Sequence, residues 1–314
     1  MAITAAMVKE LREMTGAGMM DCKKALTNTD GDMDAAVEFL RENGLAKAAK
    51  KAGRIAAEGL VAVAVSEDAK EAAIVEVNSE TDFVAKNDTF RTYVAEVADQ
   101  ALTTKAADIE GFLAEESKAE AGKTVKEALD GKIAVIGENL NIRRFAKVSA
   151  ADGFVASYIH AGGKIGVLVE VATDVVNDEI KEMAKNIAMQ ITAMKPVYTN
   201  DSEVDEEYKA HELEIIKSQI ENDPKMAGKP EKVINGAIMG RLNKQLKEIC
   251  LLDQVYVKAE DGKQSVAAYV AQVAKANNAK VVVKGFVRFE TGEGMEKKNE
   301  DFAAEVAAQM AAAK

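Results

Sequence analysis

The runs GLVAVAV (residues 59–65) and AAIVEV (residues 72–77) decide the core of this chain. Both are rich in β-branched and small apolar residues, which is typical of paired β-strands. The charged segment SEDAKE (residues 66–71) lies between them and predicts a turn. Apolar residues at helical spacing follow, from Phe90 to Ala101. We therefore predict a β-hairpin that is followed and covered by a helix.

The same order of segments occurs a second time. GFVASYI (residues 153–159) and IGVLVEV (residues 165–171) flank the turn HAGGK, and a helical pattern follows at 180–191. We interpret this as an internal duplication, in which each hairpin-plus-helix unit needs the other to cover its sheet. The predicted fold class is α+β with antiparallel sheets, and further strand-like segments lie at residues 142–148 and 281–290.

The first 55 residues predict a module of three short helices. Thr4 is suited to cap the first helix, and the two glycines of TGAG (residues 15–18) interrupt the chain after it. Asp32 is suited to cap the third helix, which we expect to end at Asn43-Gly44. The basic, alanine-rich stretch after Gly44 is expected to be a helical linker.

Two long helical patterns, at 203–221 and 231–249, are separated by a proline-containing turn. They predict an antiparallel helical hairpin, and because each helix has only one apolar face, we expect the hairpin to project from the core. A last helix, capped by Asp301, is expected near the end of the chain. The expected domains are 1–55 (three helices and linker), 56–150 (first core subdomain), 151–195 with 250–290 (second core subdomain), 196–249 (inserted hairpin) and 291–314 (C-terminal helical module).

Composition narrows the class of protein. The 314 residues are 48% hydrophobic and 30% charged, which favours a folded protein, and no apolar run approaches the roughly 20 residues of a membrane span. The charged N-terminal segment lacks the apolar centre of a signal peptide, so we expect a cytoplasmic protein. A net charge of −11 and the absence of Trp disfavour general binding to nucleic acid or to acidic membranes.

Motifs of enzyme sites are incomplete. GAGMMD (residues 16–21) lacks the third glycine of a dinucleotide-binding loop, and His211-Glu212 lacks the second histidine of a zinc helix. The two cysteines, Cys22 and Cys250, are far apart in sequence and are expected to be buried thiols. We predict a protein without enzyme activity, metal or cofactor. An enzyme with an acid pair in a core cleft is the alternative left open.

The segment TDFVAKN (residues 81–87) places an acid, a large aromatic and a cation close together after a predicted strand. In one interpretation it is a helix N-terminus, with Thr81 or Asp82 as cap and Phe83 in the core. In the other, Asp82 and Phe83 form an exposed wedge. The second half of the duplication has ATDVV (residues 172–176), with Val in place of Phe, which favours a role for Phe83 beyond shared packing.

Several stretches together resemble the bacterial elongation factor Ts family, in the expected order and over nearly the whole chain. TGAGMMDCKKAL and TDFVAKN are the most specific of them, whereas residues 100–130 and 197–270 match the family only in pattern. The stretches are VKELREMTGAGMMDCKKAL (8–26), VNSETDFVAKN (77–87), GENLNIRRF (137–145), GFVRFETGEGMEK (285–297) and DFAAEVAAQ (301–309).

This resemblance implies a guanine-nucleotide exchange factor for the GTPase elongation factor Tu. It implies a ubiquitin-associated-like N-terminal domain, a duplicated α+β core, a protruding helical hairpin and a C-terminal module. By matching motif, Thr81, Asp82, Phe83 and Val84 would displace the magnesium ion and GDP. Contacts that grip the GTPase domain are expected from Lys9, Arg12, Met19, Met20 and Lys23. His160, in the turn HAGGK, is a weaker candidate for partner binding.

The expected partner is elongation factor Tu, bound through its GTPase domain and a further domain, without nucleic acid or membrane. The sequence is compatible with both a monomer and a homodimer. Paired methionines such as Met19 and Met20 usually fill a core, and they are also suited to an adaptable protein interface. An adaptor that binds a ubiquitin-like protein or a nascent chain through the three-helix module is the alternative function, but it leaves the duplicated core unexplained.

Overall fold

The computed structural model describes residues 3–296, so the helix expected at Asp301 lies outside the described residues. The helices are α1 (Ala5–Thr15), α2 (Met19–Asn28), α3 (Met33–Lys51), α4 (Asp82–Ala85), α5 (Asp88–Thr103), α6 (Ile109–Ala114), α7 (Val125–Ile136), α8 (Asp178–Met194), η1 (Asp201–Glu203), α9 (Glu206–Glu221), α10 (Glu231–Ile249), η2 (Leu251–Asp253) and α11 (Val266–Ala276). The strands are β1 (Glu58–Val65), β2 (Glu71–Ser79), β3 (Asn141–Ser149), β4 (Phe154–His160), β5 (Ile165–Thr173) and β6 (Val281–Glu290).

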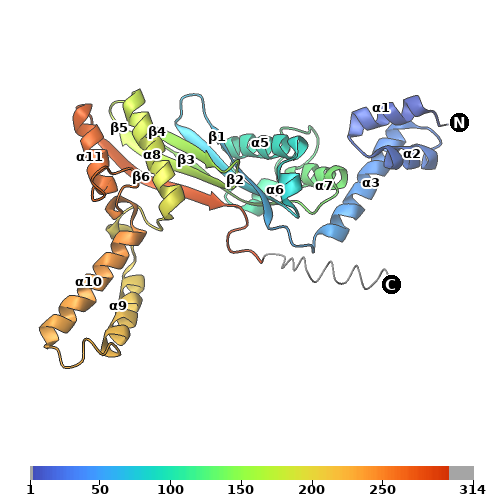
Figure 1. Cartoon of the computed structure of the whole chain (residues 1–314). Coiled ribbons are helices and arrows are strands. Elements are labelled where there is room, and N and C mark those ends of the chain that lie inside the picture. The colour runs from blue at the N-terminus through green and yellow to red at the C-terminus, as the bar shows by residue number, and fades with distance from the viewer. Residues whose placement is uncertain (1–2, 297–314) are drawn as a thin grey trace.

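Two three-stranded antiparallel sheets, β1-β2-β3 and β4-β5-β6, form the centre of the molecule (Figure 1). The predicted α+β class with antiparallel sheets is therefore confirmed. The sheets contact each other through apolar side chains that include Ile74 from the first and Leu168 from the second, both fully buried. Helix α5 covers the outer face of the first sheet and α8 covers that of the second, so each unit of the duplication shields one sheet.

The two halves share one irregularity but differ in the loop that follows. A bulge lies at Glu76/Val77 in the first sheet and at Glu170/Val171 in the second, which aligns the two VEV segments. With the two bulges aligned, the loops that follow differ in length. The loop from β2 to α5 contains residues 80–87, whereas the loop from β5 to α8 contains residues 174–177. The pairing of TDFV with TDVV is therefore wrong: the first half contains four additional residues, and they form the extra turn α4.

The N-terminal module contains α1, α2 and α3, with Thr4 and Asp32 capping α1 and α3 as predicted. The expected end of the third helix at Asn43-Gly44 is wrong, because α3 continues to Lys51. A Cβ at Gly44 would lie 3.2 Å from the Cβ of Ala134 on α7. The glycine is therefore a point of close helix–helix packing and does not terminate the helix.

Helices α9 and α10 form the predicted antiparallel hairpin, which extends away from the sheets in Figure 1. Its apolar seam is a cluster of its own, separate from the clusters under the two sheets. The buried members of the seam are Ile216, Ile220, Ile238 and Leu242.

Candidate partner-binding site

The segment TDFVAKN forms the one-turn helix α4. The Thr81 side chain caps this turn by accepting a hydrogen bond from the Val84 backbone N–H, at 3.3 Å. Val84 and Ala85 face the core of the first half, whereas the Phe83 side chain is 80% exposed. Each interpretation of the sequence was thus partly correct: Thr81 is a helix cap, and Phe83 is exposed.

A cation and a carboxylate lie beside the exposed Phe83 ring. The Lys86 ammonium lies 2.6 Å from the Asp82 carboxylate and 6.0 Å from the centre of the Phe83 ring. The hydrogen bond from Lys86 holds the pKa of Asp82 below its ordinary value, and the charge of Lys164 contributes. The turn therefore presents an aromatic ring next to a carboxylate that stays ionised at neutral pH.

Two carboxylates attach this turn to the loop after α7. Glu138 accepts hydrogen bonds from the Thr81 backbone N–H (3.0 Å) and the Thr81 hydroxyl (2.6 Å). In return, Glu80 accepts one from the Asn139 backbone N–H, at 2.6 Å. Glu138 was not among the site residues predicted from the sequence. The available signal was its place in GENLNIRRF, directly after Gly137, which ends α7 with a positive φ of 87°.

His160, the weaker candidate, is exposed at the end of β4, and its Nδ1 lies 3.0 Å from the Tyr158 hydroxyl. The turn after it contacts the first half of the core, since Gly163 accepts a hydrogen bond from the Val61 N–H at 2.7 Å. Only glycine fits at 163, where φ is +108° and a Cβ would lie 2.7 Å from the Leu60 side chain. The next residue, Lys164, pairs with Glu58, which lies opposite Ser79 at the end of β2, so this turn lies near the start of α4.

The five residues expected in the N-terminal grip are all exposed, on α1 and at the start of α2. Met19 and Met20 are 61% and 75% exposed, so the core-packing interpretation of these methionines is wrong. Met14, at 59% exposure, is a third exposed methionine on the module's surface. The exposed grip residues are Lys9, Arg12, Met19, Met20 and Lys23.

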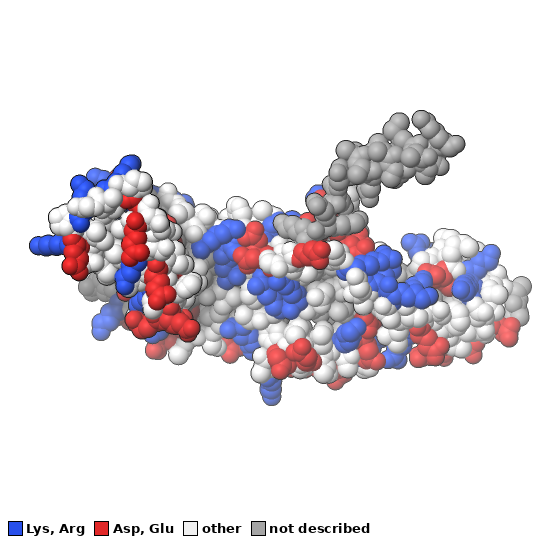
Figure 2. Space-filling view, turned by 90° about the horizontal axis from the view of Figure 1, so that it is seen from below, with Lys and Arg blue, Asp and Glu red and all other residues white. Residues whose placement is uncertain are grey.

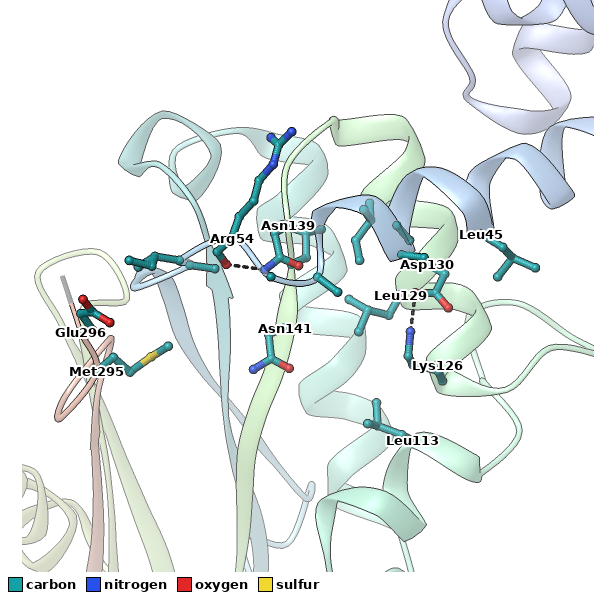
Figure 3. A pocket seen from close by; sticks show the side chains of 18 residues that line it. Leu45, Arg54, Leu113, Lys126, Leu129, Asp130, Asn139, Asn141, Met295 and Glu296 are labelled. Carbon is teal, nitrogen blue, oxygen red and sulfur yellow. Dashed lines mark hydrogen bonds and ion pairs between the residues drawn. The ribbon is translucent and has the colours of Figure 1, made fainter. Parts of the chain in front are cut away.

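A cavity of about 580 Å³ lies between the end of α3, α7 and the start of β3 (Figure 3). Alanine, leucine and isoleucine side chains form most of its lining, and Asp130 is paired there with Lys126. Glu296, the second carboxylate of the lining, lies at the opposite end of the view. The two acids are therefore not arranged as a general acid–base pair.

Neither cysteine is poised for chemistry. Burial raises the pKa of the Cys22 thiol and raises that of Cys250 to about 11, so both stay protonated at neutral pH.

Within residues 3–296, no cluster of three or more His, Cys, Asp and Glu side chains is placed to hold a metal ion. Over the same range, no helix has the length and apolar character needed to cross a membrane. On the face shown in Figure 2, basic and acidic side chains are interspersed.

Comparisons with known proteins identify the family. A family model described as "Elongation factor TS" matches residues 80–293. Elongation factor Ts of Clostridioides difficile (strain 630) is 53% identical over 308 residues, covering 98% of this chain and 99% of that protein. The chain belongs to the elongation factor Ts family. Elongation factor Ts of Clostridium botulinum (strain Eklund 17B / Type B) is 51% identical with the same coverage, and that of Clostridium perfringens (strain 13 / Type A) is 50% identical over 97% of this chain and 98% of its own length.

Membership in the elongation factor Ts family confirms the resemblance found in the sequence. The match of the family model begins at Glu80, one residue before the α4 turn, and so includes this turn, the Glu138 loop and His160. The N-terminal module lies outside that match but inside the 98% of the chain that aligns with the clostridial elongation factors Ts. An elongation factor Ts is an exchange factor, not an enzyme, which agrees with the incomplete enzyme motifs.

Proposed function

We propose that this chain is the guanine-nucleotide exchange factor for elongation factor Tu, and that Asp82 and Phe83 on α4 dislodge the magnesium ion and GDP. The observation that carries the proposal is the exposure of Phe83, at 80%, on a turn that only the first half of the duplication contains. A large apolar side chain held in water has no stabilising role in the fold, whereas aromatic anchors dominate protein interfaces. Thr81 holds the turn through its hydrogen bond to Glu138, and Val84 holds it by packing against the core of the first half.

The mechanism is thermodynamic linkage. A factor that binds the empty GTPase more tightly than the loaded one weakens nucleotide binding by the same ratio. Shifting the GTPase from mostly loaded to mostly empty needs about 5.5 kcal/mol of differential binding. Displacement of magnesium is an effective source of this energy, because the ion is the largest local charge beside the phosphates. The empty nucleotide site of elongation factor Tu then binds GTP.

The other parts of the chain supply affinity in this proposal. The three-helix module, as a ubiquitin-associated-like domain, grips the GTPase domain through Lys9, Arg12, Met19, Met20 and Lys23. His160, which is exposed at the end of β4, is a weaker candidate for a contact with elongation factor Tu. Exchange takes place in the bacterial cytoplasm, and homodimerisation is compatible with the proposal.

Replacement of Phe83 by alanine tests the wedge. Phe83→Ala is expected to lower the maximal rate of GDP release by at least about tenfold, because the ring that separates parts of the GTPase is lost. The concentration that gives half-maximal rate should change much less, since the grip is intact. Stopped-flow release of a fluorescent GDP from elongation factor Tu measures both.

Val176→Ala is the matched control, because Val176 is 52% exposed in the corresponding loop of the second half. It should leave the rate of GDP release unchanged. Near-normal acceleration by Phe83→Ala would refute the wedge, and failure of the unaltered chain to accelerate release would refute the exchange function itself.

A further inference from the structure

The direction of the Phe83 side chain is set by the backbone of α4. The ring is 80% exposed, so core packing does not hold it, and α4 has only four residues, of which Ala85 is the buried one. A single helical turn is not stable by itself. Val84 and Ala85 hold one side of the turn against the core, and the contacts at the start of α4 complete the positioning of Phe83.

The start of α4 is held by an exchange of carboxylates between two loops. Glu138 binds both the backbone N–H and the hydroxyl of Thr81, while Glu80 binds the backbone N–H of Asn139. Hydrogen bonds to ionised acceptors are roughly twice as strong as neutral ones. Because each loop gives one carboxylate and receives the other, the two loops are fixed against each other in both position and rotation.

The same loop is attached to the helix that leads to the N-terminal module. The Asn139 side-chain amide donates to the Arg54 carbonyl oxygen at 2.8 Å, as the dashed line in Figure 3 shows. Lys51, the last residue of α3, donates to the Gly137 carbonyl oxygen, and the Arg54 guanidinium lies 3.5 Å from Glu80. A continuous set of polar contacts thus runs from the end of α3 through residues 137–139 to the wedge turn.

We propose that Glu138 is a positioning residue for nucleotide exchange, and that the loop 137–139 sets the direction of the wedge relative to α3, the helix that joins the N-terminal module to the core. This inference rests on the proposed function of α4. It assigns Glu138 no contact with the GTPase; each of its two carboxylate oxygens accepts a hydrogen bond from Thr81. The role is to keep Phe83 and Asp82 in one orientation before the partner binds, so that less ordering is needed on binding.

Glu138→Ala tests this positioning role. Losing both hydrogen bonds to Thr81 frees the start of α4, and the maximal rate of GDP release should fall roughly five- to tenfold, because misplaced groups lose most of their effect. The concentration for half-maximal rate should change less than about threefold, since the grip residues are untouched. Glu138→Gln retains an acceptor for the Thr81 N–H and should restore part of the rate.

Glu115→Ala is the control for a purely structural effect. Glu115 makes the same kind of contact elsewhere, accepting from the Thr104 hydroxyl at 2.7 Å and from the Lys105 backbone N–H at 3.1 Å. These residues follow the C-terminal end of α5, whereas α4 precedes its N-terminal end. This variant should lose stability in thermal unfolding to a similar degree as Glu138→Ala and should keep the full exchange rate.

A double-mutant cycle decides whether Glu138 acts through Phe83. In a chain that already carries Phe83→Ala, adding Glu138→Ala should cause little further loss, because the group being positioned is absent. Additive losses, or equal losses from Glu138→Ala and Glu115→Ala, would overturn the positioning role. If the unaltered chain accelerates GDP release and Glu138→Ala does so equally well, this inference fails while the exchange function stands.

Discussion

Glu76 illustrates how one residue joins parts of the chain that are far apart in sequence. Its side chain has no exposed surface, and its carboxylate lies 3.1 Å from Arg143, 2.6 Å from Arg144 and 2.8 Å from the Gly292 N–H. Burial alone would raise the pKa of Glu76, but the hydrogen bonds from Gly292 and Asn78 and the Arg144 charge outweigh it and hold the pKa below its usual value. The residue therefore stays ionised and links β2, β3 and the segment after β6.

Glu76→Gln is expected to lower the free energy of unfolding at pH 7 by about 2–3 kcal/mol, because two partly exposed arginines lose their buried partner. A depressed folded-state pKa stabilises the fold above the unfolded value, near 4.5, and this stabilisation is lost as the pH falls through the folded value. The difference between variant and unaltered chain should therefore shrink below pH 4.5.

Urea unfolding followed by circular dichroism at pH 7, 4 and 3 measures this difference. Glu290, whose pKa is lowered to about 2 by hydrogen bonds from Lys195 and Arg288, changes stability in the same direction and is present in both proteins. Its contribution cancels in the comparison. A difference that stays constant with pH would contradict the assigned role of the Glu76 charge.

At the scale of elements, the local sequence pattern and the long-range packing favour different ends for the helix α3. Asn43-Gly44 has the composition of a helix end, yet α3 continues through it because Gly44 lies against Ala134 of α7. The hairpin of α9 and α10 shows the opposite case. Its apolar seam is self-contained, so the periodicity of each helix was sufficient to predict it.

Ile220→Ala is expected to destabilise the hairpin by about 2–4 kcal/mol, because Ile220 is 1% exposed and its truncation leaves a cavity in the small seam. The two sheets have separate cores and should keep their stability. Hydrogen exchange by mass spectrometry should show faster exchange in α9 and α10 alone. Ile215→Ala, at a neighbouring site that is 37% exposed, is the control, and equal exchange in both variants would count against a distinct seam.

At the scale of the molecule, the N-terminal module and the core are joined through α3. Ala48 belongs to the core cluster of the first half, and Arg41 lies 2.7 Å from Glu127 on α7. The C-terminal part of this helix is therefore a component of the core, although its basic composition resembles a linker.

Deletion experiments can separate the grip from the core. A chain that lacks residues 1–43 should nearly keep the core's unfolding temperature, because Ala48 and Lys51 remain in place and the lost Arg41–Glu127 pair is partly exposed and contributes little. A chain that lacks 1–55 should unfold at least about 3 °C lower, since it loses their contacts with α7 and Gly137. Differential scanning calorimetry measures the temperatures.

Both truncated chains should bind elongation factor Tu more weakly in titration calorimetry, because both lack the grip residues. Unchanged affinity would contradict the gripping role. Equal unfolding temperatures of the two truncated chains would contradict the placement of residues 44–55 in the core.

The amino-acid sequence by itself determined the strands, the helices of the hairpin, the duplication and the family, because alternation, helical spacing, caps and long motifs are local properties. The helices α6, α7 and α11 were not predicted from it. Only the tertiary structure decided that Phe83 is exposed while Val84 is packed, that α3 passes through Gly44, and that Glu138 holds Thr81. The last two depend on surfaces that meet across 57 residues or more, as in the contact of Gly44 with Ala134 and the hydrogen bond from Thr81 to Glu138. Local pattern carries no information on such contacts, since burial and partner choice are set only when the chain has folded.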